Sequence, residues 1–599
     1  MSQTEFAATL NAAMKLFLRM RLPDEAVAYA KKRVLDPAQS EPWVGLGDVY
    51  VARGDLAKRR PKPMTKREAQ PGELRGVGAN LARVWRCWSN SLGRVIMSST
   101  MRRNCARMIP AGSLSSWLEI ARNRRDWEAM RTLASDLARV APSDATGWRD
   151  LATVFFEQGL HRDAVTAFEQ VLNIEGRTGE SLAQYAALAI QALDFDRVQS
   201  ALDEAEAIEP LHPRVLSTRA LLLTYQGRTQ EAEDYCRRCI AADPTFMSVY
   251  PQLSVLRKGR LEDDEQARLK EYVGREDVAA GARSSASFVL AHSYDAAGDY
   301  DAAFAEYDVA NKLSVAKNES ESLYYNDEGL GAWTDAIIDV FRQGASNEAA
   351  SSETGPQPIF IVGLPRSGST LIETMLAAHS QVSDGGEMPM MPQIFNNWLK
   401  QNHQRSDAVL TEEERKALAE GYMAGVRNFD SARFTDKNLL NIESAGMIAQ
   451  IFPNAKIINI RRNPVESALS IWRHDLPKFW AYANRFEDIA ARYGHYARLV
   501  DHFERVLGAR FTTVQYEDFA ENFEPRARAL IDWCGLDWED ACANPQTARD
   551  VAATLSAVQV RGAIARAPDR APSYASHLGP LRAALEAAGL DLQTGALKG

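Results

Sequence analysis

Residues 358–377, PIFIVGLPRSGSTLIETMLA, decide the fold of the second half of this chain. The run from Pro358 to Gly363 is short, apolar and rich in residues that favour strands, so it predicts a buried strand. A helical stretch begins at Leu371, and the loop before it has the pattern G-x-x-x-x-G-x-T, with glycines at Gly363 and Gly368. A strand, a glycine-containing loop and a helix in this order predict that backbone N–H groups bind a phosphate.

The same loop argues against one class of phosphate-binding protein. Ser369 stands where a nucleoside-triphosphate-binding loop carries lysine. Without that lysine, the β- and γ-phosphates and their magnesium ion lose a partner. A nucleoside-triphosphate hydrolase or kinase is therefore disfavoured, and magnesium-dependent ATP hydrolysis would be needed to revive it.

A second strand and helix follow about 100 residues later. The run 455–460, AKIINI, reads as a buried strand that leads into RRNP. Asn463 is a good N-cap, Pro464 suits the first helical position, and Glu466 is placed to complete a capping box. We therefore expect a helix to begin directly after Asn463.

This helix predicts a second site for an anion. Ser470 lies seven residues after the cap, which is about two helical turns and therefore the same face. Arg462 directly precedes the cap. We expect Arg462 and Ser470 to converge on one anion.

The first half of the chain repeats with a period near 34 residues. Pro142, Pro210 and Pro244 follow expected helix ends, 68 and then 34 residues apart, with Gly176 as the boundary between the first two. Residues 148–172, WRDLATVFFEQGLHRDAVTAFEQVL, have the small and large apolar pattern of a helix-turn-helix unit. Further copies are marked at 43–54, 227–232 and 294–307. Because no such unit buries its face alone, the pattern predicts an α-solenoid with a binding surface for a partner.

These patterns divide the chain. We expect a helical solenoid over 1–346, a polar linker over 347–357 and an α/β domain over 358–599. A segment at about 58–107 interrupts the repeats and carries thirteen basic and two acidic residues. It is either a functional cationic insert or an irregular segment that adds little to function.

Composition excludes several classes. The chain has 599 residues, a length that corresponds to about three to five domains. Its fractions of apolar and charged residues are those of a soluble globular protein. A net charge of −9 gives no reason to expect nucleic acid as a partner. No apolar run is long enough to span a membrane, and the N-terminus lacks the features of a secretory signal, so we expect a cytoplasmic protein.

The six cysteines indicate neither a disulfide framework nor a metal site. They make up about 1% of the chain, which suits a reducing compartment. Cys236 and Cys239 form a C-x-x-C inside a helical pattern, and no second cysteine or histidine pair follows at zinc-site spacing. We expect this pair to pack in a helix, and we expect no metal cofactor.

The motifs together resemble a known family. P-R-S-G-S-T after the first strand and R-N-P-x-E-x-x-x-S after the later one look like the paired signature of sulfotransferases that use 3′-phosphoadenosine 5′-phosphosulfate. Three further stretches agree: FTDKNLLN at 434–441, VQYEDF at 514–519 and LSAVQVRG at 555–562. With its repeats, the chain resembles bacterial tetratricopeptide-repeat sulfotransferases, whose catalytic half is similar to protein-tyrosine sulfotransferases. The resemblance implies an all-α tetratricopeptide-repeat solenoid followed by a P-loop-like parallel-sheet α/β domain.

The resemblance also implies residues that bind the donor. The 5′-phosphosulfate would be held by Arg366, Ser367, Gly368, Ser369 and Thr370. The 3′-phosphate would be held by Arg462 and Ser470, with Tyr516 against the nucleotide and Ser556 near the transferring group. Arg570 matches a basic donor-binding residue near the C-terminus.

Catalysis would depend on charge and on one proton acceptor. Sulfuryl transfer moves a charged group between oxygens, so positioning and cationic stabilisation supply most of the catalysis. Arg366 and Lys437 would supply the charge, and Ser556 would contact the donor near the transferring group. Glu387 matches the general base of the family, and the two glycines before it allow a tight turn near a ligand.

Two departures from the family keep a second function open. Pro389 stands where the tyrosine sulfotransferases have an arginine, and Ala571 stands where they have a tryptophan. The first function is transfer of a sulfuryl group to a hydroxyl acceptor, for which a protein tyrosine docked on the repeats, a carbohydrate and a small molecule all fit the motifs. The alternative is a repeat-based partner-binding protein whose nucleotide-binding domain has impaired catalysis.

Overall fold

The computed structural model describes residues 111–123, 126–342, 355–402, 409–426, 429, 431–545 and 569–598. The expected repeat at 43–54, the basic segment 58–107, most of the linker 347–357 and Ser556 lie outside these residues. The chain divides into two compact units, Met1–Arg177 and Thr178–Gly599.

The described part of the first unit consists of helical hairpins. Its helices are α6 (Ala111–Asn123), α7 (Trp127–Val140), α8 (Ala145–Glu157) and α9 (His161–Glu175). The side chains of Asp126 and Asp144 accept hydrogen bonds from the first turns of α7 and α8, which satisfies N–H groups that a helix leaves open. A Cβ atom on Gly147 would lie 2.8 Å from the backbone nitrogen of Ala138, so a small residue is needed where α7 and α8 touch.

Helical hairpins continue in the second unit. They are α10 (Gly179–Gln191), α11 (Phe195–Ile208), α12 (Pro213–Tyr225), α13 (Thr229–Ala242), α14 (Tyr250–Leu256), α15 (Asp263–Gly274), α16 (Ala280–Ala297), α17 (Tyr300–Ser320) and α18 (Asp327–Val340). The helices α8, α10 and α12 begin 34 residues apart along the chain, which confirms the predicted period. Gly227 and Gly298 adopt left-handed conformations after α12 and α16, where each hairpin turns.

The predicted C-x-x-C packs inside a helix. Cys236 and Cys239 lie on α13 and belong to a buried cluster with Leu216, Tyr250 and Leu253. Burial raises the pKa of each thiol to about 12, so both thiols stay protonated near neutral pH. The pair therefore serves the packing of the hairpins.

A five-stranded parallel sheet forms the second half of the same unit. Its strands are β1 (Gln357–Gly363), β2 (Val382–Ser383), β3 (Arg433–Asp436), β4 (Lys456–Arg461) and β5 (Phe511–Gln515), in the order β2-β3-β1-β4-β5. Phe360 is paired with Asp436 and Gly363 with Ile460, so β1 lies between β3 and β4. The predicted strands at 358–363 and 455–460 are therefore the two central neighbours of the sheet.

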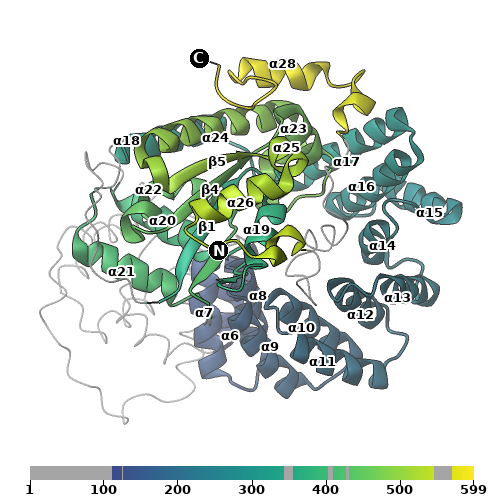
Figure 1. Cartoon of the computed structure of the whole chain (residues 1–599). Coiled ribbons are helices and arrows are strands. Elements are labelled where there is room, and N and C mark those ends of the chain that lie inside the picture. Colours follow the sequence, from purple (N-terminus) through teal and green to yellow (C-terminus); the bar gives the residue numbers. More distant parts are fainter. Residues whose placement is uncertain are drawn as a thin grey trace, which may run out of the picture. The chain divides into compact units, whose positions relative to one another are not determined.

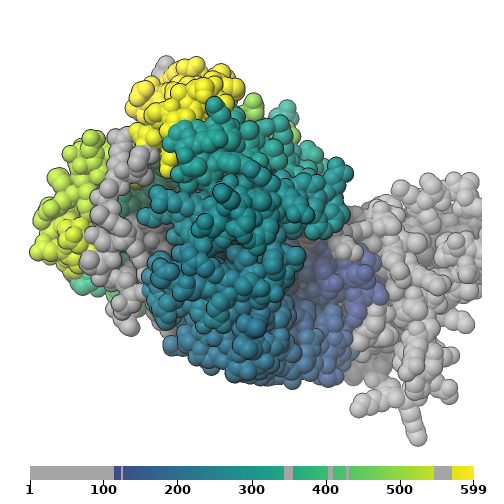
Figure 2. All heavy atoms as spheres, turned by 90° about the vertical axis from the view of Figure 1, so that its right-hand side faces the viewer, coloured from purple at the N-terminus to yellow at the C-terminus, as the bar shows by residue number. Residues whose placement is uncertain are grey.

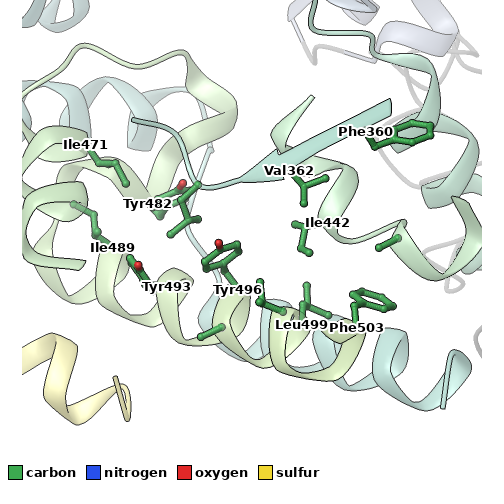
Figure 3. Close-up of a cluster of buried hydrophobic side chains, with 14 of the residues drawn as sticks. Phe360, Val362, Ile442, Ile471, Tyr482, Ile489, Tyr493, Tyr496, Leu499 and Phe503 are labelled. Atoms are coloured by element: carbon green, nitrogen blue, oxygen red, sulfur yellow. The ribbon is translucent and has the colours of Figure 1, made fainter. Parts of the chain in front are cut away.

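Both faces of the sheet are buried, as expected for parallel strands (Figure 1). On one face, Val362 lies on the side of Tyr496 and Leu499 of α24 (Phe486–Leu507), as Figure 3 shows. Phe360 on the same face packs against Tyr422 and Phe452, with ring centroids 5.9 and 6.3 Å away. On the other face, Ile359 and neighbouring isoleucines pack against α19 (Ser369–Ala377) and α26 (Phe523–Trp533). The sheet is therefore the middle layer of three, with buried clusters on both faces.

Repeat helices and sheet are joined by buried polar contacts. Asn311 of α17 donates a 2.9 Å hydrogen bond from Nδ2 to the backbone oxygen of Trp472, at the end of α23 (Pro464–Trp472). An imidazole nitrogen of His292 lies 3.0 Å from the backbone oxygen of Arg473. In Figure 2 the teal surface of α16 and α17 adjoins the yellow C-terminal segment, where Phe304 stacks on His577 with ring centroids 4.3 Å apart. The helices α16 and α17 are thus part of the same folded body as the sheet.

No helix in the described part of the chain combines the length and the apolar character needed to cross a bilayer.

Candidate active site

The loop after β1 carries two residues in left-handed backbone conformations. Arg366 has a φ of +67° and Gly368 a φ of +98°. The left-handed conformation costs a non-glycine residue about 1–2 kcal/mol, and strain of this kind gathers at binding sites. A Cβ atom on Gly368 would lie 2.3 Å from Cδ2 of Tyr516, so the loop needs glycine where it passes the tyrosine ring.

The start of α19 leaves polar groups available to a ligand. The helix begins at Ser369, with Thr370 in its first turn, and the first N–H groups of a helix have no partner within it. Ser367 is 1% exposed, and its buried Oγ has no hydrogen-bond partner among the described residues. A buried hydroxyl without a partner is costly unless a ligand atom completes its hydrogen bonding. The loop therefore fits an anion whose oxygens accept from the helix N-terminus and from Ser367.

The residues expected to form the second anion site contact a residue of the first. The guanidinium of Arg462 donates from Nη1 to the backbone oxygen of Arg366 over 3.2 Å. The Nε atom of Arg366 lies 3.4 Å from Oγ of Ser470, a long hydrogen bond. Arg366 therefore contacts both residues that were expected to converge on one anion, Arg462 through its backbone oxygen and Ser470 through its side chain.

This group of residues is cationic. Burial, together with the nearby charges of Arg462 and Arg473, lowers the pKa of Arg366 to about 10. Among the described residues, no carboxylate forms an ion pair with Arg366 or Arg462. Arg462 instead lies over the ring of Tyr516, with its guanidinium carbon 5.0 Å from the ring centroid. A cluster of positive charge without carboxylate partners favours a bound anion.

The helix cap predicted after β4 is confirmed in part. Asn463 is the N-cap of α23 and accepts from the backbone nitrogens of Val465 and Glu466, and Pro464 occupies the first helical position. The predicted capping box is wrong. The backbone nitrogen of Asn463 donates to Oε1 of Glu517 over 2.8 Å, so Glu466 is not needed there.

Glu466 instead holds the C-terminal segment. Its carboxylate accepts from the backbone nitrogens of Arg570 and Ala571 over 3.0 and 2.7 Å. The side chain of Arg570 lies 3.7 Å from Oδ2 of Asp295. Arg570 is therefore placed beside the N-terminus of α23, with its charge directed to a repeat helix.

The loops that follow β1 and β4 lie at the point where the order of the strands in the sheet reverses. The chain leaves β1 toward β2 and leaves β4 toward β5, which lie on opposite sides of the β1–β4 pair. Ligands of open α/β sheets bind in the crevice at the carboxyl ends of such a strand pair. Gly363 and Arg461 end these two strands. The sheet therefore places the loops after β1 and β4 side by side, at the position where ligands of such sheets bind.

Two residues expected to act in catalysis, Lys437 and Glu387, contact each other at the end of the neighbouring strand. Lys437 directly follows β3, and its Nζ lies 2.6 Å from Oε1 of Glu387. The backbone nitrogen of Lys437 also donates to the oxygen of Gly386 over 2.8 Å, so the loop carrying Glu387 is bonded to the end of β3. Gly386 has a φ of +69°, and a Cβ atom on Gly385 would lie 1.9 Å from the backbone oxygen of Thr435. Both glycines are therefore required by this turn, as the sequence predicted for tight backbone approach.

Two buried acids at this site were not predicted. Asp436 is fully buried and accepts from the hydroxyl of Tyr422 over 2.9 Å, and burial raises its pKa to about 7. Glu373 lies on α19 with its Oε2 3.8 Å from Nζ of Lys437. One sequence feature could have indicated Glu373, because it is the single acid in the otherwise apolar helical run LIETMLA.

No group of three or more histidines, cysteines or carboxylates in the described ranges is placed to hold a metal ion. Ser556 lies outside those ranges.

Fold and site together define an α/β protein that carries tetratricopeptide-like hairpins and a cluster of arginines at the carboxyl edge of its sheet. Residues 358–540 match the model of the sulfotransferase family, and residues 213–246 match the model of the tetratricopeptide repeat. The resemblance to tetratricopeptide-repeat sulfotransferases expected from the sequence is confirmed.

Several known proteins are similar to this chain. An uncharacterized protein of Aquifex aeolicus is 28% identical over 401 residues, which cover 63% of this chain and 51% of that one. Protein-tyrosine sulfotransferase A of Caenorhabditis elegans is 29% identical over 192 residues, which cover 30% of this chain and 50% of that one. The solved sulfotransferase domain of the Synechococcus PCC 7002 olefin synthase is 19% identical, with a TM-score of 0.26, and the match covers 41% of this chain and 98% of that one. The chain spans about half the length of the curated relatives it matches.

Proposed function

We propose that this protein transfers a sulfuryl group from 3′-phosphoadenosine 5′-phosphosulfate to a hydroxyl acceptor. The observation that supports the proposal is the cluster at the carboxyl ends of β1 and β4, where Arg366 contacts Arg462 and Ser470 beside the unpartnered hydroxyl of Ser367. A donor with two separate anionic groups matches two anion-binding loops.

In this proposal each loop holds one end of the donor. Arg366, Ser367, Gly368, Ser369 and Thr370 bind the 5′-phosphosulfate, and Arg462 and Ser470 bind the 3′-phosphate. The ring of Tyr516, which contacts Gly368 and lies under Arg462, packs against the nucleotide. Arg570 contributes charge from the C-terminal segment, and Ser556 contacts the donor near the transferring group.

The reaction is a single displacement at sulfur. The acceptor oxygen forms a bond to sulfur, while the bond from sulfur to the 5′-phosphate oxygen breaks. Glu387 takes the proton of the acceptor hydroxyl, and the other products are the sulfated acceptor and 3′-phosphoadenosine 5′-phosphate. Lys437 and Arg366 stabilise the negative charge that develops on the leaving oxygen.

The proposed acceptor is a protein tyrosine. Two points support this choice: the similarity to a protein-tyrosine sulfotransferase over 192 residues, and hairpins of a repeat type that commonly binds extended chains. A carbohydrate or a small-molecule hydroxyl would use the same donor site. A screen of peptide, carbohydrate and phenol acceptors with sulfur-35-labelled donor separates the three.

The donor site is tested by calorimetric titration. We expect 3′-phosphoadenosine 5′-phosphate to bind and ATP with magnesium to bind much more weakly. Arg462→Ala should weaken nucleotide binding roughly 10- to 100-fold, because it removes a charge-assisted contact. Glu387→Gln should leave binding intact and lower turnover by about 10²–10⁴-fold. Full turnover in Glu387→Gln would show that another group is the base.

A second function is favoured by two observations. The charge of Arg570 is directed to Asp295, and Pro389 stands near the proposed base without a cationic side chain. A partner-binding protein with impaired catalysis would bind 3′-phosphoadenosine 5′-phosphate but transfer no sulfuryl group to any acceptor in the screen.

A further inference from the structure

A buried carboxylate on α19 lies behind the proposed catalytic lysine. The side chain of Glu373 is 4% exposed, and that of Lys437 is 2% exposed. Neighbours of Glu373 on α19, including Ile372 and Met375, belong to the apolar core. Burying a carboxylate costs several kcal/mol unless a cation or hydrogen-bond donors compensate it. Nζ of Lys437, 3.8 Å from Oε2 of Glu373, supplies that compensation.

Lys437 therefore has two carboxylate partners of different kinds. Glu387 is the nearer partner at 2.6 Å, but its side chain is 60% exposed. Glu373 is the more distant partner at 3.8 Å, but its side chain is buried in the core. Burial alone would lower the pKa of Lys437, and the charges of Glu373 and Glu387 outweigh burial and raise it.

The proposed reaction makes different demands on the two partners. Glu387 must turn to the acceptor hydroxyl to take its proton, and it then no longer neutralises the lysine. Lys437 must at the same time point to the leaving oxygen with its charge intact. A lysine whose only partner had left would be a buried, uncompensated cation, which favours loss of its proton.

We propose that Glu373 is the permanent counter-ion of Lys437, a positioning residue that keeps the ammonium group charged and in place when Glu387 turns to the acceptor. This inference rests on the proposed function. Glu387 is the exchangeable partner and Glu373 the fixed one.

Contacts through Thr435 support this division. The hydroxyl of Thr435 donates to Oε1 of Glu373 over 3.5 Å and accepts from the backbone nitrogen of Gly385 over 3.2 Å. Thr435 is fully buried on β3. Glu373 is therefore linked, through one hydroxyl, to the turn that carries Glu387. A change at Glu373 reaches both members of the catalytic pair.

The charged surroundings of Lys437 define what a pH experiment measures. Among the described residues, the carboxylates that act on it are Glu373 from α19 and Asp384 and Glu387 from the turn after β2. Asp436, which precedes it on β3, faces Tyr422 of α21 (Glu412–Met423). Burial and the charge of Glu387 raise the pKa of Tyr225 at the end of α12.

The kinetic test is the pH dependence of turnover in Glu373→Gln. This variant keeps the shape of the side chain and removes one negative charge from beside Lys437. We expect the pKa of Lys437 to fall, so the alkaline limb of kcat should move to lower pH and kcat should fall roughly tenfold or more. Affinity for 3′-phosphoadenosine 5′-phosphate should stay within about twofold of wild type. Glu373→Asp, which restores the charge, should return the limb toward its wild-type position.

A thermal-unfolding cycle tests the same pair without any turnover. Lys437→Met should lower Tm, because it leaves Glu373 buried without its cation. Adding Glu373→Gln to Lys437→Met should recover most of that loss. The matched control adds Glu387→Gln to Lys437→Met and should recover little, because Glu387 is exposed and hydrated.

The outcomes separate this inference from the proposed function. If wild type transfers sulfuryl groups but Glu373→Gln keeps the wild-type kcat and alkaline limb, Glu373 is not the counter-ion. If the two double variants recover Tm equally, the inference is also overturned, even where no acceptor has been found. Absence of donor binding in wild type would overturn the proposed function while leaving the unfolding cycle to decide on Glu373.

Discussion

The hydroxyl of Tyr574 donates a 2.5 Å hydrogen bond to Oδ1 of Asp295, joining the C-terminal segment to repeat helix α16. The other carboxylate oxygen of Asp295 lies 2.7 Å from Nη2 of Arg473, one residue beyond the end of α23. Both side chains of this ion pair are at most 10% exposed. Asp295 therefore connects three segments that are far apart in the sequence.

We expect Asp295→Asn to destabilise the protein strongly. Removing one partner of a buried ion pair leaves the other charge uncompensated, which typically costs about 3–5 kcal/mol. Urea unfolding measures the change. The control is Asp301→Asn, because Asp301 is 85% exposed and its contact with His577 lies at the surface, where a pair contributes at most about 1 kcal/mol. Equal effects of the two substitutions would show that burial of the Asp295 pair is unimportant.

Gly368→Ala should damage nucleotide binding through Tyr516. The new methyl group would meet the tyrosine ring at 2.3 Å, and the ring cannot stay in place. Gly589→Ala is the matched control, since Gly589 also has a positive φ, +78°, but has open space around its Cβ position. Both substitutions should cost about 1–2 kcal/mol of stability from backbone strain. Only Gly368→Ala should weaken binding of 3′-phosphoadenosine 5′-phosphate in calorimetry, and an unchanged Kd would place the nucleotide away from Tyr516.

Asp436 should make stability depend on pH. Its pKa is about 7 in the folded protein and 3.8 for the unperturbed group, so the folded state binds the proton more tightly. This contribution is fully present below about pH 4 and is lost as pH rises to about 7, by up to ~4 kcal/mol. Asp436→Asn removes it. Urea midpoints should therefore favour the variant increasingly between pH 4 and pH 7, and a constant difference would show that Asp436 is ionised in the folded protein.

Glu466→Ala should loosen the C-terminal segment. The substitution removes both acceptors of the amides of Arg570 and Ala571, and hydrogen bonds to charged groups contribute about 1.5–3 kcal/mol each. Hydrogen exchange of these two amides should become roughly 10- to 100-fold faster. Glu524→Ala, which removes an exposed pair with Arg528, should leave them unchanged. If the amides exchange at the wild-type rate in Glu466→Ala, other contacts fix the segment.

Local patterns predicted much of this fold. The sequence predicted the strand at 358–363, the following loop and α19. It could do so because the apolar pattern, the positions of the glycines and the start of the helix agree over about 20 residues. The cap at Asn463 and Pro464 was readable for the same reason. The arrangement of neighbouring strands followed from none of these patterns, since parallel pairing depends on crossovers of many residues.

The errors and omissions share a physical cause. Glu466 has the spacing of a capping box, but its amide partners lie 104 and 105 residues away, and the competing acceptor Glu517 comes from another strand end. Glu373 is paired with a lysine that joins it only when β1 and β3 lie side by side. Partners of buried charges are set by tertiary structure, so a single sequence indicates the unusual residue without identifying its partner.

The contacts of α16 and α17 determine which fragment of this chain can be expressed and exchanged intact. A fragment that began at residue 358 would present Trp472, Arg473 and Tyr574 to water without the helices that cover them. A fragment that began at Thr178 would keep those contacts. A crossover between genes that fell upstream of α16 would therefore keep the sheet together with the hairpins that cover it, whereas one at residue 358 would separate them.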